Sequence, residues 1–377
     1  MGNKKTKAIA FYLPQFYPTP ENDEWWAPGF TEWTNVARAK PLFKGHYQPR
    51  IPGELSFYDL RLPSVRERQA ELAREAGIYG FCYWHYWFGN GKRLLSDVFK
   101  EVVETGKPDF PFCLCWANHS WYQKTWDPTK PAKLLMEQTY PGVEDYKAHF
   151  YEMLPAFKDE RYIKVNGKLL FGVFDAYKIP DKKLFFETWN ELAKDNGLDG
   201  FSFFAFVQGS GDLAKIDRDE YDLIVFDAYF NATSYEYNKK GLRGFFNKIK
   251  RKIFSLPVVV DYLDYVNIAV SFFKNNPNII PCIDPDFDHT PRSGNKTALL
   301  HNSSPQKWGG LVKQIKSLID NGYSFDNIIF IKAWNEWGEG NYLEPDMRFG
   351  KAYIEETAKA LNGVLPQPKI EDAGAVD

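Results

Sequence analysis

The sequence PSVRERQAELAREAGIYGFCYW, residues 63–84, contains the pattern that decides the fold. Its first part, Pro63–Ala76, has helical periodicity, and Gly77 follows at the position of a C-terminal cap. Its second part, Tyr79–Trp84, is an almost continuous apolar run, which is typical of strands buried on both faces of a parallel sheet. A helix that leads directly into a buried strand indicates an α/β architecture.

The same alternation extends over the whole chain. Eight β-rich apolar runs are predicted as strands: Ala8–Leu13, Tyr79–Trp84, Pro111–Trp116, Leu169–Phe174, Gly200–Val207, Leu223–Ala228, Ile279–Ile283 and Asn327–Ala333. Helical periodicity is found between most of them, at Pro63–Ala76, Leu94–Glu104, Val143–Lys158, Leu184–Asp195, Pro305–Asn321 and Lys351–Asn362. Eight such units in 377 residues predict a (β/α)8 TIM barrel, with one catalytic domain over residues 1–365 and a polar tail over residues 366–377. An open doubly wound sheet is the alternative, but no G-x-G-x-x-G or Walker sequence follows any of the runs.

Two segments exceed a minimal barrel: Gln15–Leu62 after the first strand and Phe230–Val258 after the sixth. Both are predicted as long loops on the C-terminal face, where such barrels build their active sites.

Composition narrows the classes of ligand. The formal net charge of −2 argues against a nucleic-acid partner. The basic residues Lys248, Lys250, Arg251 and Lys252 are interpreted as a solvated helix face. Aromatic residues make up 17% of the chain, with 12 Trp and 22 Tyr. Their flat apolar faces suit either sugar rings or an aromatic core, and composition leaves both interpretations open.

The cysteines and the N-terminal sequence indicate in which cellular compartment the protein is expected. Cys82, Cys113, Cys115 and Cys282 all lie in apolar runs and are predicted to be buried free thiols, which fits a reducing compartment. The apolar stretch before Pro14 is too short for a signal-peptide core, and no stretch approaches the ~20 apolar residues of a membrane span. We therefore expect a cytoplasmic protein, or a periplasmic one if a signal was removed from the chain.

Polar and aromatic residues follow every predicted strand, where barrel side chains point into a site. The strongest such segment is NIIFIKAWNEWGEGNYLEP, residues 327–345, in which Glu336 and Glu339 follow the last strand between tryptophans and glycines. Cleavage of a glycoside needs one carboxyl group to protonate the leaving oxygen and a second group to supply or generate the nucleophile. Two nearby carboxylates repel each other, so one has a raised pKa and can act as the acid.

A metal site has weaker support. Asp284, Asp286 and Asp288 alternate along the chain, but the glycine and terminal glutamate of a calcium loop are missing. We expect neither a metal nor a cofactor.

Four segments together resemble the WbsX-like family of polysaccharide-locus proteins, which is related to glycoside hydrolase family 99. They are YLPQFYPTPENDEWWAPGFTEWTNVARAKPLFKGHYQPRIP (residues 12–52), YDLRLPSVRERQAELAREAGIYGFCYWHYWFGNGKRLL (58–95), KPDFPFCLCWAN (107–118) and IKAWNEWGEGNYLEPD (331–346). The resemblance implies a (β/α)8 barrel and a retaining reaction through a 1,2-anhydro sugar. It assigns Glu336 as the base toward the sugar 2-hydroxyl and Glu339 as the acid/base. Family members often read W-A-N-E-N-W-T after the third strand, whereas here His119 replaces the carboxylate, which implies a different substrate preference.

The sequence therefore predicts a retaining glycoside hydrolase whose partner is a carbohydrate. The expected substrate-binding residues are Tyr12, Glu32, Trp33, His85, Trp116, Asn118, Asp175, Asp227, Asp284, Trp334, Asn335 and Tyr342. One alternative is a glycosyltransferase of surface-polysaccharide (O-antigen or lipopolysaccharide) biosynthesis, as family members are named from their gene neighbourhoods. A further alternative is a non-catalytic glycan-binding barrel. No feature of the sequence indicates an oligomeric state.

Overall fold

Eight parallel strands close into a barrel in the computed structural model, which describes residues 6–123, 132–218, 220–239, 249, 251, 253–322 and 327–362. The strands are β1 (Lys7–Tyr12), β2 (Gly80–His85), β3 (Phe112–Trp116), β7 (Lys168–Val173), β8 (Phe201–Gln208), β9 (Leu223–Asp227), β11 (Ile280–Ile283) and β13 (Ile328–Ile331). Each pairs with the next, and β13 pairs with β1, so the barrel is closed. All eight predicted strands and the (β/α)8 architecture are confirmed.

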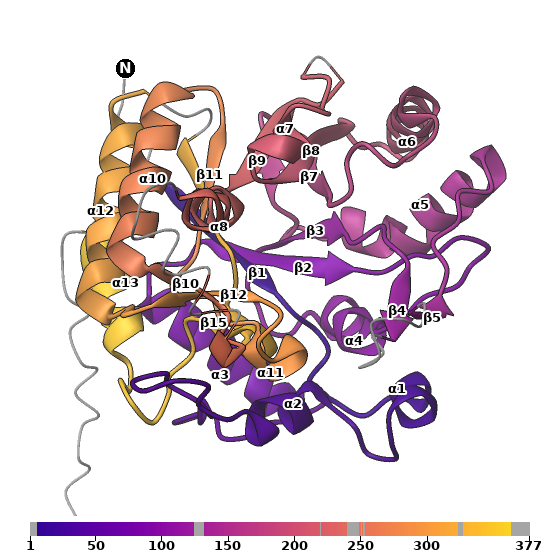
Figure 1. The fold of residues 1–377 in the computed structure, drawn as a ribbon. Helices are drawn as coiled ribbons and strands as arrows, with labels where there is room; N and C mark the ends of the chain where they lie inside the picture. Colours follow the sequence, from indigo (N-terminus) through magenta and orange to yellow (C-terminus); the bar gives the residue numbers. More distant parts are fainter. Residues whose placement is uncertain are drawn as a thin grey trace, which may run out of the picture.

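Helices surround this barrel (Figure 1). The principal ones are α3 (Pro63–Glu75), α4 (Asp97–Thr105), α5 (Val143–Phe157), α6 (Lys182–Asp195), α10 (Tyr262–Asn275), α12 (Pro305–Asp320) and α13 (Ala352–Asn362). The six predicted helices are confirmed, and Gly77 follows α3 with a φ of +79°, a conformation in which glycine carries no steric cost. Only the four-residue α7 (Ser210–Leu213) connects β8 to β9.

The two segments predicted as loops contain regular structure. The first carries α1 (Pro20–Trp25) and α2 (Glu32–Arg38), and the second begins with α8 (Tyr229–Asn238) and ends at β10 (Val258–Asp261). Of the predicted basic patch, Lys248, Lys250 and Lys252 lie outside the described residues, as does the predicted tail at residues 366–377. The assignment of residues 1–365 to a single domain stays a prediction.

Aromatic side chains fill the barrel interior. Phe11 stacks on Trp84 with ring centroids 4.5 Å apart and contacts Phe206 edge-on at 5.1 Å. Gly172 in β7 has no side chain where the Phe204 ring lies, and a Cβ there would collide with that ring. Much of the aromatic content therefore serves the core. The four cysteines are buried free thiols, as predicted.

Three further pairs of short strands lie outside the barrel wall. The β14 (Asn335–Glu336) and β15 (Asn341–Tyr342) strands form an antiparallel hairpin around the 3-10 turn η2 (Trp337–Glu339). The β4 (Trp121–Gln123) and β5 (Lys133–Met136) strands form another, while β10 pairs in parallel with β12 (Ala298–His301). No helix among the described residues is long and apolar enough to cross a membrane.

Candidate active site

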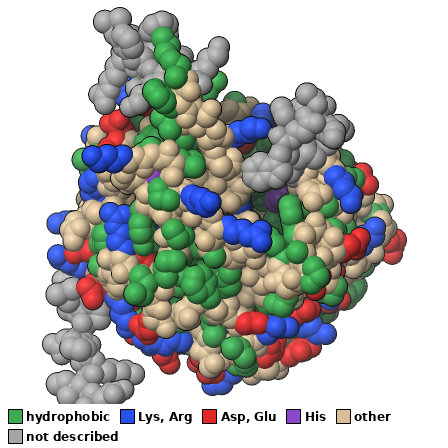
Figure 2. Space-filling model, turned by 60° about the horizontal axis from the view of Figure 1, so that its bottom comes forward, with side chains coloured by type: hydrophobic (Ala, Val, Ile, Leu, Met, Phe, Trp, Pro, Cys, Tyr) green, Lys and Arg blue, Asp and Glu red, His purple; other side chains and the backbone are tan. Residues whose placement is uncertain are grey.

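A cavity of about 600 Å³ opens at the carboxyl ends of the barrel strands. Segments that follow β1, β2, β3, β11 and β13 supply most of its wall. Its aromatic lining consists of Trp25, Trp26, Phe30, Trp84, Tyr86, Trp121, Tyr122 and Phe174. Its polar lining includes Glu32, Asn35, His119, Ser120, Gln208, His289, Arg292, Lys332, Glu336 and Glu339. Figure 2 shows hydrophobic side chains grouped on the face formed by the lower elements of Figure 1, among them α1 and α2.

The β14–β15 hairpin carries both candidate catalytic carboxylates into this cavity. Asn335 pairs with Tyr342 and Glu336 with Asn341, and the chain reverses through η2 and Gly340, whose φ is +57°. Gly338 is needed for close packing, because a Cβ there would collide with the Glu32 carboxylate and the guanidinium of Arg292. The hairpin therefore has a fixed path that brings Glu336 and Glu339 to the same wall.

Arg292 of the short helix α11 (Thr290–Ser293) bonds three carboxylates at once. Its Nη2 donates to Glu336 Oε1 at 2.7 Å, and its Nη1 donates to Glu339 Oε1 at 2.9 Å. Its Nε donates to Glu32 Oε2 at 3.0 Å. Both candidate carboxylates are thus ion-paired within the cavity, and one guanidinium faces three acids.

Burial together with the neighbouring charges raises the pKa of Glu336 to about 8. Burial is the largest cause, because it disfavours the ionised form. The positive charge of Arg292 opposes the shift, whereas the negative charges of Glu339 and Glu32 add to it. Glu336 therefore takes up a proton more readily than an exposed glutamate does.

A second ion pair lies at the base of the cavity. Lys332 Nζ bonds Asp227 Oδ2 at 2.6 Å, and both side chains are buried. Asp284 lies beyond them, where it accepts from the Tyr265 hydroxyl at 3.0 Å and from Asn341 Nδ2 at 2.8 Å. Burial and the charge of Asp227 raise the pKa of Asp284 well above its usual range. Asp227 and Asp284 support the cavity from below and, contrary to expectation, do not line it.

Of the fourteen predicted site residues, only Glu32, Glu336 and Glu339 line the cavity. The strand-end prediction failed for His85 because successive strand residues point to opposite faces. Trp84 lines the cavity, and His85 instead bonds His149 between the two Nε2 atoms at 2.7 Å. His85 is also adjacent to a separate cavity of about 110 Å³ lined by residues of α4 and α5.

The predicted amide and carboxylate contacts after β3 and β7 are structural. Asn118 accepts from the backbone N–H of Asp175 at 2.8 Å and donates to its carbonyl at 3.2 Å, which joins the two strand ends. The Asp175 carboxylate pairs with Lys178 at 2.6 Å. Asn335 exchanges two hydrogen bonds with the backbone of Leu13 and so anchors the hairpin to β1. These groups are occupied by protein partners and lie outside the cavity lining.

The predicted aromatic contacts at Tyr12, Trp33, Trp116, Trp334 and Tyr342 are buried packing groups. Four of them have a polar partner outside the cavity: Gln69 for Tyr12, the Tyr58 carbonyl for Trp33, the Trp87 carbonyl for Trp116 and Asp346 for Tyr342. Tyr342 stacks on Trp337 at 3.7 Å, and Trp334 packs against Phe81 at 5.6 Å. These five side chains pack behind the residues that line the cavity and do not line it themselves.

The sequence-based reasoning missed Arg292, Lys332 and most of the aromatic lining. Trp25 and Trp26 lie in the loop that was predicted to reach the site, so their dipeptide was a usable signal. Lys332 directly follows β13, where a charged residue among apolar neighbours was also visible. Arg292 had no such signal, because its partners are remote in sequence.

His119 does reach the cavity. Burial lowers the pKa of its imidazole, so the side chain is neutral near pH 7. His119 therefore places an uncharged imidazole at the position where the W-A-N-E-N-W-T pattern has a carboxylate.

The aspartates that follow β11 have protein cations or donors as partners. Asp286 pairs with Arg50 at 2.9 Å, and Asp288 bonds His46 at 2.8 Å. Within the described ranges, no group of three or more His, Cys, Asp or Glu side chains is arranged to hold a metal ion.

Known structures share this fold. A solved structure named "Glycoside hydrolase-like protein" aligns with a TM-score of 0.61 and 12% identity over 96% of this chain and 95% of that chain. An endo-alpha-mannosidase of family GH99 from Bacteroides thetaiotaomicron aligns with a TM-score of 0.54 and 14% identity over 94% of this chain and 96% of that chain. At these identities the likeness is one of fold.

Sequence relatives add the family. The protein "Uncharacterized protein WxcX" of Xanthomonas campestris pv. campestris is 34% identical over 357 residues, which are 94% of this chain and 49% of that protein. The chain thus spans about half the length of the curated relatives it matches. The family model "Glycosyltransferase WbsX" matches residues 8–357. The chain therefore belongs to the WbsX family, as its motifs predicted.

Proposed function

We propose that this chain cleaves glycosidic bonds as a retaining glycoside hydrolase of an oligosaccharide or polysaccharide. The observation that carries the proposal is the convergence of Glu336 and Glu339 on one guanidinium inside an aromatic-walled cavity. The cavity volume of about 600 Å³ is in the range of specific ligand sites. Aromatic walls with a few convergent charged groups suit a ligand with apolar C–H faces and polar edges.

The proposed reaction has two steps. In the first, Glu336 takes the proton of the sugar 2-hydroxyl while O2 attacks C1, and Glu339 protonates the leaving oxygen as its bond to C1 breaks. In the second, Glu339 takes a proton from water, whose oxygen attacks C1 and opens the 1,2-anhydro ring, and O2 regains its proton from Glu336. The substrate therefore carries a free 2-hydroxyl trans to the leaving group.

The raised pKa falls on Glu336, the proposed base, although two nearby carboxylates would simply suggest a raised pKa for the proposed acid, so the proposal depends on the ionised form of Glu336. The raised pKa of Glu336 makes its ionised form a stronger base than an exposed glutamate, which is required for a weakly acidic sugar hydroxyl. Arg292 provides a fixed positive charge between the two groups, so they can remain close while protons move. Glu32 adds a third acid on the other side of that guanidinium.

A glycosyltransferase is the second candidate, favoured by the description of the family model. The same two carboxyl groups would then serve a sugar acceptor in place of water, with an activated sugar as donor. A third candidate, a glycan-binding barrel without turnover, predicts that Glu339→Gln leaves glycan affinity unchanged and that no glycan is ever cleaved.

The deciding experiment is a screen of aryl glycosides and purified polysaccharides in which new reducing ends are counted. A hydrolase releases reducing ends with the wild type and loses this activity with Glu339→Gln while binding is retained. Thermal protection by a nucleotide sugar, with no reducing ends released from any glycan, would replace the hydrolase with the transferase.

A further inference from the structure

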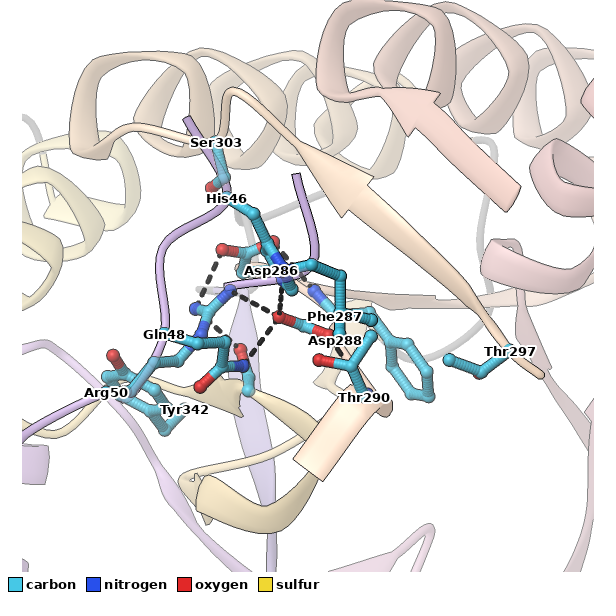
Figure 3. Close-up of polar contacts among 12 residues, drawn as sticks. His46, Gln48, Arg50, Asp286, Phe287, Asp288, Thr290, Thr297, Ser303 and Tyr342 are labelled. Carbon is cyan, nitrogen blue, oxygen red and sulfur yellow. Dashed lines mark hydrogen bonds and ion pairs between the residues drawn. The ribbon is translucent and has the colours of Figure 1, made fainter. Parts of the chain in front are cut away.

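A second polar network contacts the β14–β15 hairpin and joins the segments that follow β1 and β11 (Figure 3). We call it the brace network and define it as His46, Gln48, Arg50, Asp286 and Asp288. The first three come from the long segment after β1, and the two aspartates come from the segment after β11. The reaction proposed above uses none of these side chains.

Asp288 is the centre of the network. Its Oδ2 accepts from Gln48 Nε2 at 2.6 Å and bonds His46 Nε2 at 2.8 Å. His46 Nδ1 accepts the backbone N–H of Leu42 at 3.0 Å, so it is Nε2 that carries the hydrogen donated to Asp288.

Asp288 is held as a carboxylate in this environment. Burial opposes its ionisation, but the hydrogen bond from His46 and the charge of Arg50 hold the pKa of Asp288 well below its usual range. The nearest Arg50 nitrogen lies 3.8 Å from Asp288 Oδ2. An ionised, fully buried group with several donors has little freedom to rotate.

The network also bonds the backbone of the catalytic turn. The backbone N–H of Asp288 donates to the carbonyl of Glu339 at 2.6 Å. Arg50 Nη1 donates to the next carbonyl, that of Gly340, at 3.1 Å and to Asp286 Oδ2 at 2.9 Å. A Cβ on Gly340 would lie 2.9 Å from Arg50 Nε and 3.0 Å from Asp288 Cβ, so the turn and the network are in direct contact.

Asp288 bonds the start of the helix that carries Arg292 as well. Its Oδ1 accepts the backbone N–H of Thr290 at 3.0 Å, and Thr290 is the first residue of α11. Asp288 therefore bonds the backbone of Glu339 through its own N–H, and its carboxylate bonds the first residue of α11, the helix that carries Arg292. The side chains of Glu339 and Arg292 meet at 2.9 Å.

We propose that Asp288 is a positioning residue that sets the Glu339 carboxylate against the Arg292 guanidinium. The proposal rests on the proposed function for its effect on turnover. If Asp288 has this role, the segment around His46 and Gln48 is also needed for turnover, although neither residue lines the cavity. A displacement of a reacting group by about 1 Å can cost about 100-fold in rate, so a loosened turn should appear in kcat.

The test compares Asp288→Asn with Asp145→Asn. Asp145 is a matched control, because it is also a buried carboxylate that accepts a side-chain and a backbone N–H, from Trp87 and Asn90, on another side of the barrel. With a glycan hydrolysed by the wild type, Asp288→Asn should lower kcat by about 10- to 100-fold with KM within threefold, and Asp145→Asn should keep kcat within threefold. An equal loss of kcat in the two variants would overturn the proposal.

A pair of milder variants covers the case in which Asp288→Asn fails to fold. His46→Leu removes one donor to Asp288, whereas His46→Gln restores an N–H donor at that position. We expect His46→Leu to lower kcat by about tenfold and His46→Gln to recover most of it. Equal kcat values in these two variants would contradict the role of this hydrogen bond.

Hydrogen–deuterium exchange separates this proposal from the proposed function, because it needs no substrate. In Asp288→Asn, or in His46→Leu if that variant alone folds, amides in peptides covering residues 289–294 and 336–342 should exchange about tenfold faster, with little change elsewhere. Unchanged exchange in either peptide refutes the positioning role, whatever the activity. Faster exchange in both, in a protein that cleaves no glycan, supports the positioning role and rejects the hydrolase.

Discussion

Replacing Arg292 with methionine should destabilise the protein in a pH-dependent way. The substitution keeps much of the side-chain volume and removes the guanidinium that bonds all three of Glu32, Glu336 and Glu339. Each hydrogen bond to a charged group contributes about 1.5–3 kcal/mol, but the carboxyl groups can take up protons once the cation is gone. Breaking a buried ion pair costs about 3–5 kcal/mol, which we adopt for the whole cluster at pH 9.

The sign of the pH dependence follows from the pKa of Glu336. Without Arg292, that pKa rises further above its value in the unfolded chain, because the guanidinium is what lowers it. A carboxyl group with a raised folded pKa contributes stability below the unfolded pKa and loses it as pH rises through the folded pKa. The cost of Arg292→Met should therefore be smaller at pH 5, where both proteins hold Glu336 protonated, and should grow as the pH rises above about 8 to pH 9.

Scanning calorimetry at both pH values measures this effect. At pH 9 we expect the midpoint of Arg292→Met to fall by at least about 5 °C, since 1 kcal/mol shifts a long chain by about 2 °C. Arg61→Met is the control, because Arg61 pairs with Asp59 at the surface and such pairs contribute about 0–1 kcal/mol. An equal shift at pH 5 and pH 9, or no shift at all, would refute the charge balance assigned to this cluster.

Three further predictions concern turnover of a glycan hydrolysed by the wild type. Glu336→Gln and Glu339→Gln should each lower kcat by at least about 100-fold with the fold intact, whereas the exposed Glu355→Gln should not; reducing-end assays and circular dichroism check this. Glu336 must be ionised to act as the base, and its pKa is raised to about 8, so kcat/KM should rise with pH through that value. A fall of kcat/KM above pH 8 would instead assign Glu336 as the acid. Trp84→Ala removes an indole that lines the cavity, and it should raise KM by about tenfold with a smaller effect on kcat; an unchanged KM would exclude the indole from sugar contact.

The barrel could be predicted from sequence because its strands are apolar on both faces. A run such as Tyr79–Trp84 has a recognisable composition wherever its neighbours lie. The helices α8 and α10 were harder to recognise, since a long insertion separates the sixth and seventh strands. Composition thus located the strands more reliably than the segments between them.

The site was predicted less completely, for two physical reasons. First, the direction of a strand-end side chain depends on a register that a shift of one residue inverts, so Trp84 lines the cavity in place of the predicted His85. Second, Arg292 gains its role from Glu32, which lies 260 positions away in sequence. The motif around Glu336 and Glu339 was informative because both acids are carried by one short hairpin.

The contacts of the β14–β15 hairpin also constrain how related chains can diverge. Side chains of the hairpin bond Arg292, while its backbone bonds Asp288 and Arg50. An insertion or deletion there would break both sets of bonds together, so we expect its length to be invariant among homologues. The cavity-lining residues Trp26 and Tyr122 are 45% and 53% exposed and, among the described residues, have no such set of bonds to keep, so we expect their identity to vary more among homologues than the hairpin does.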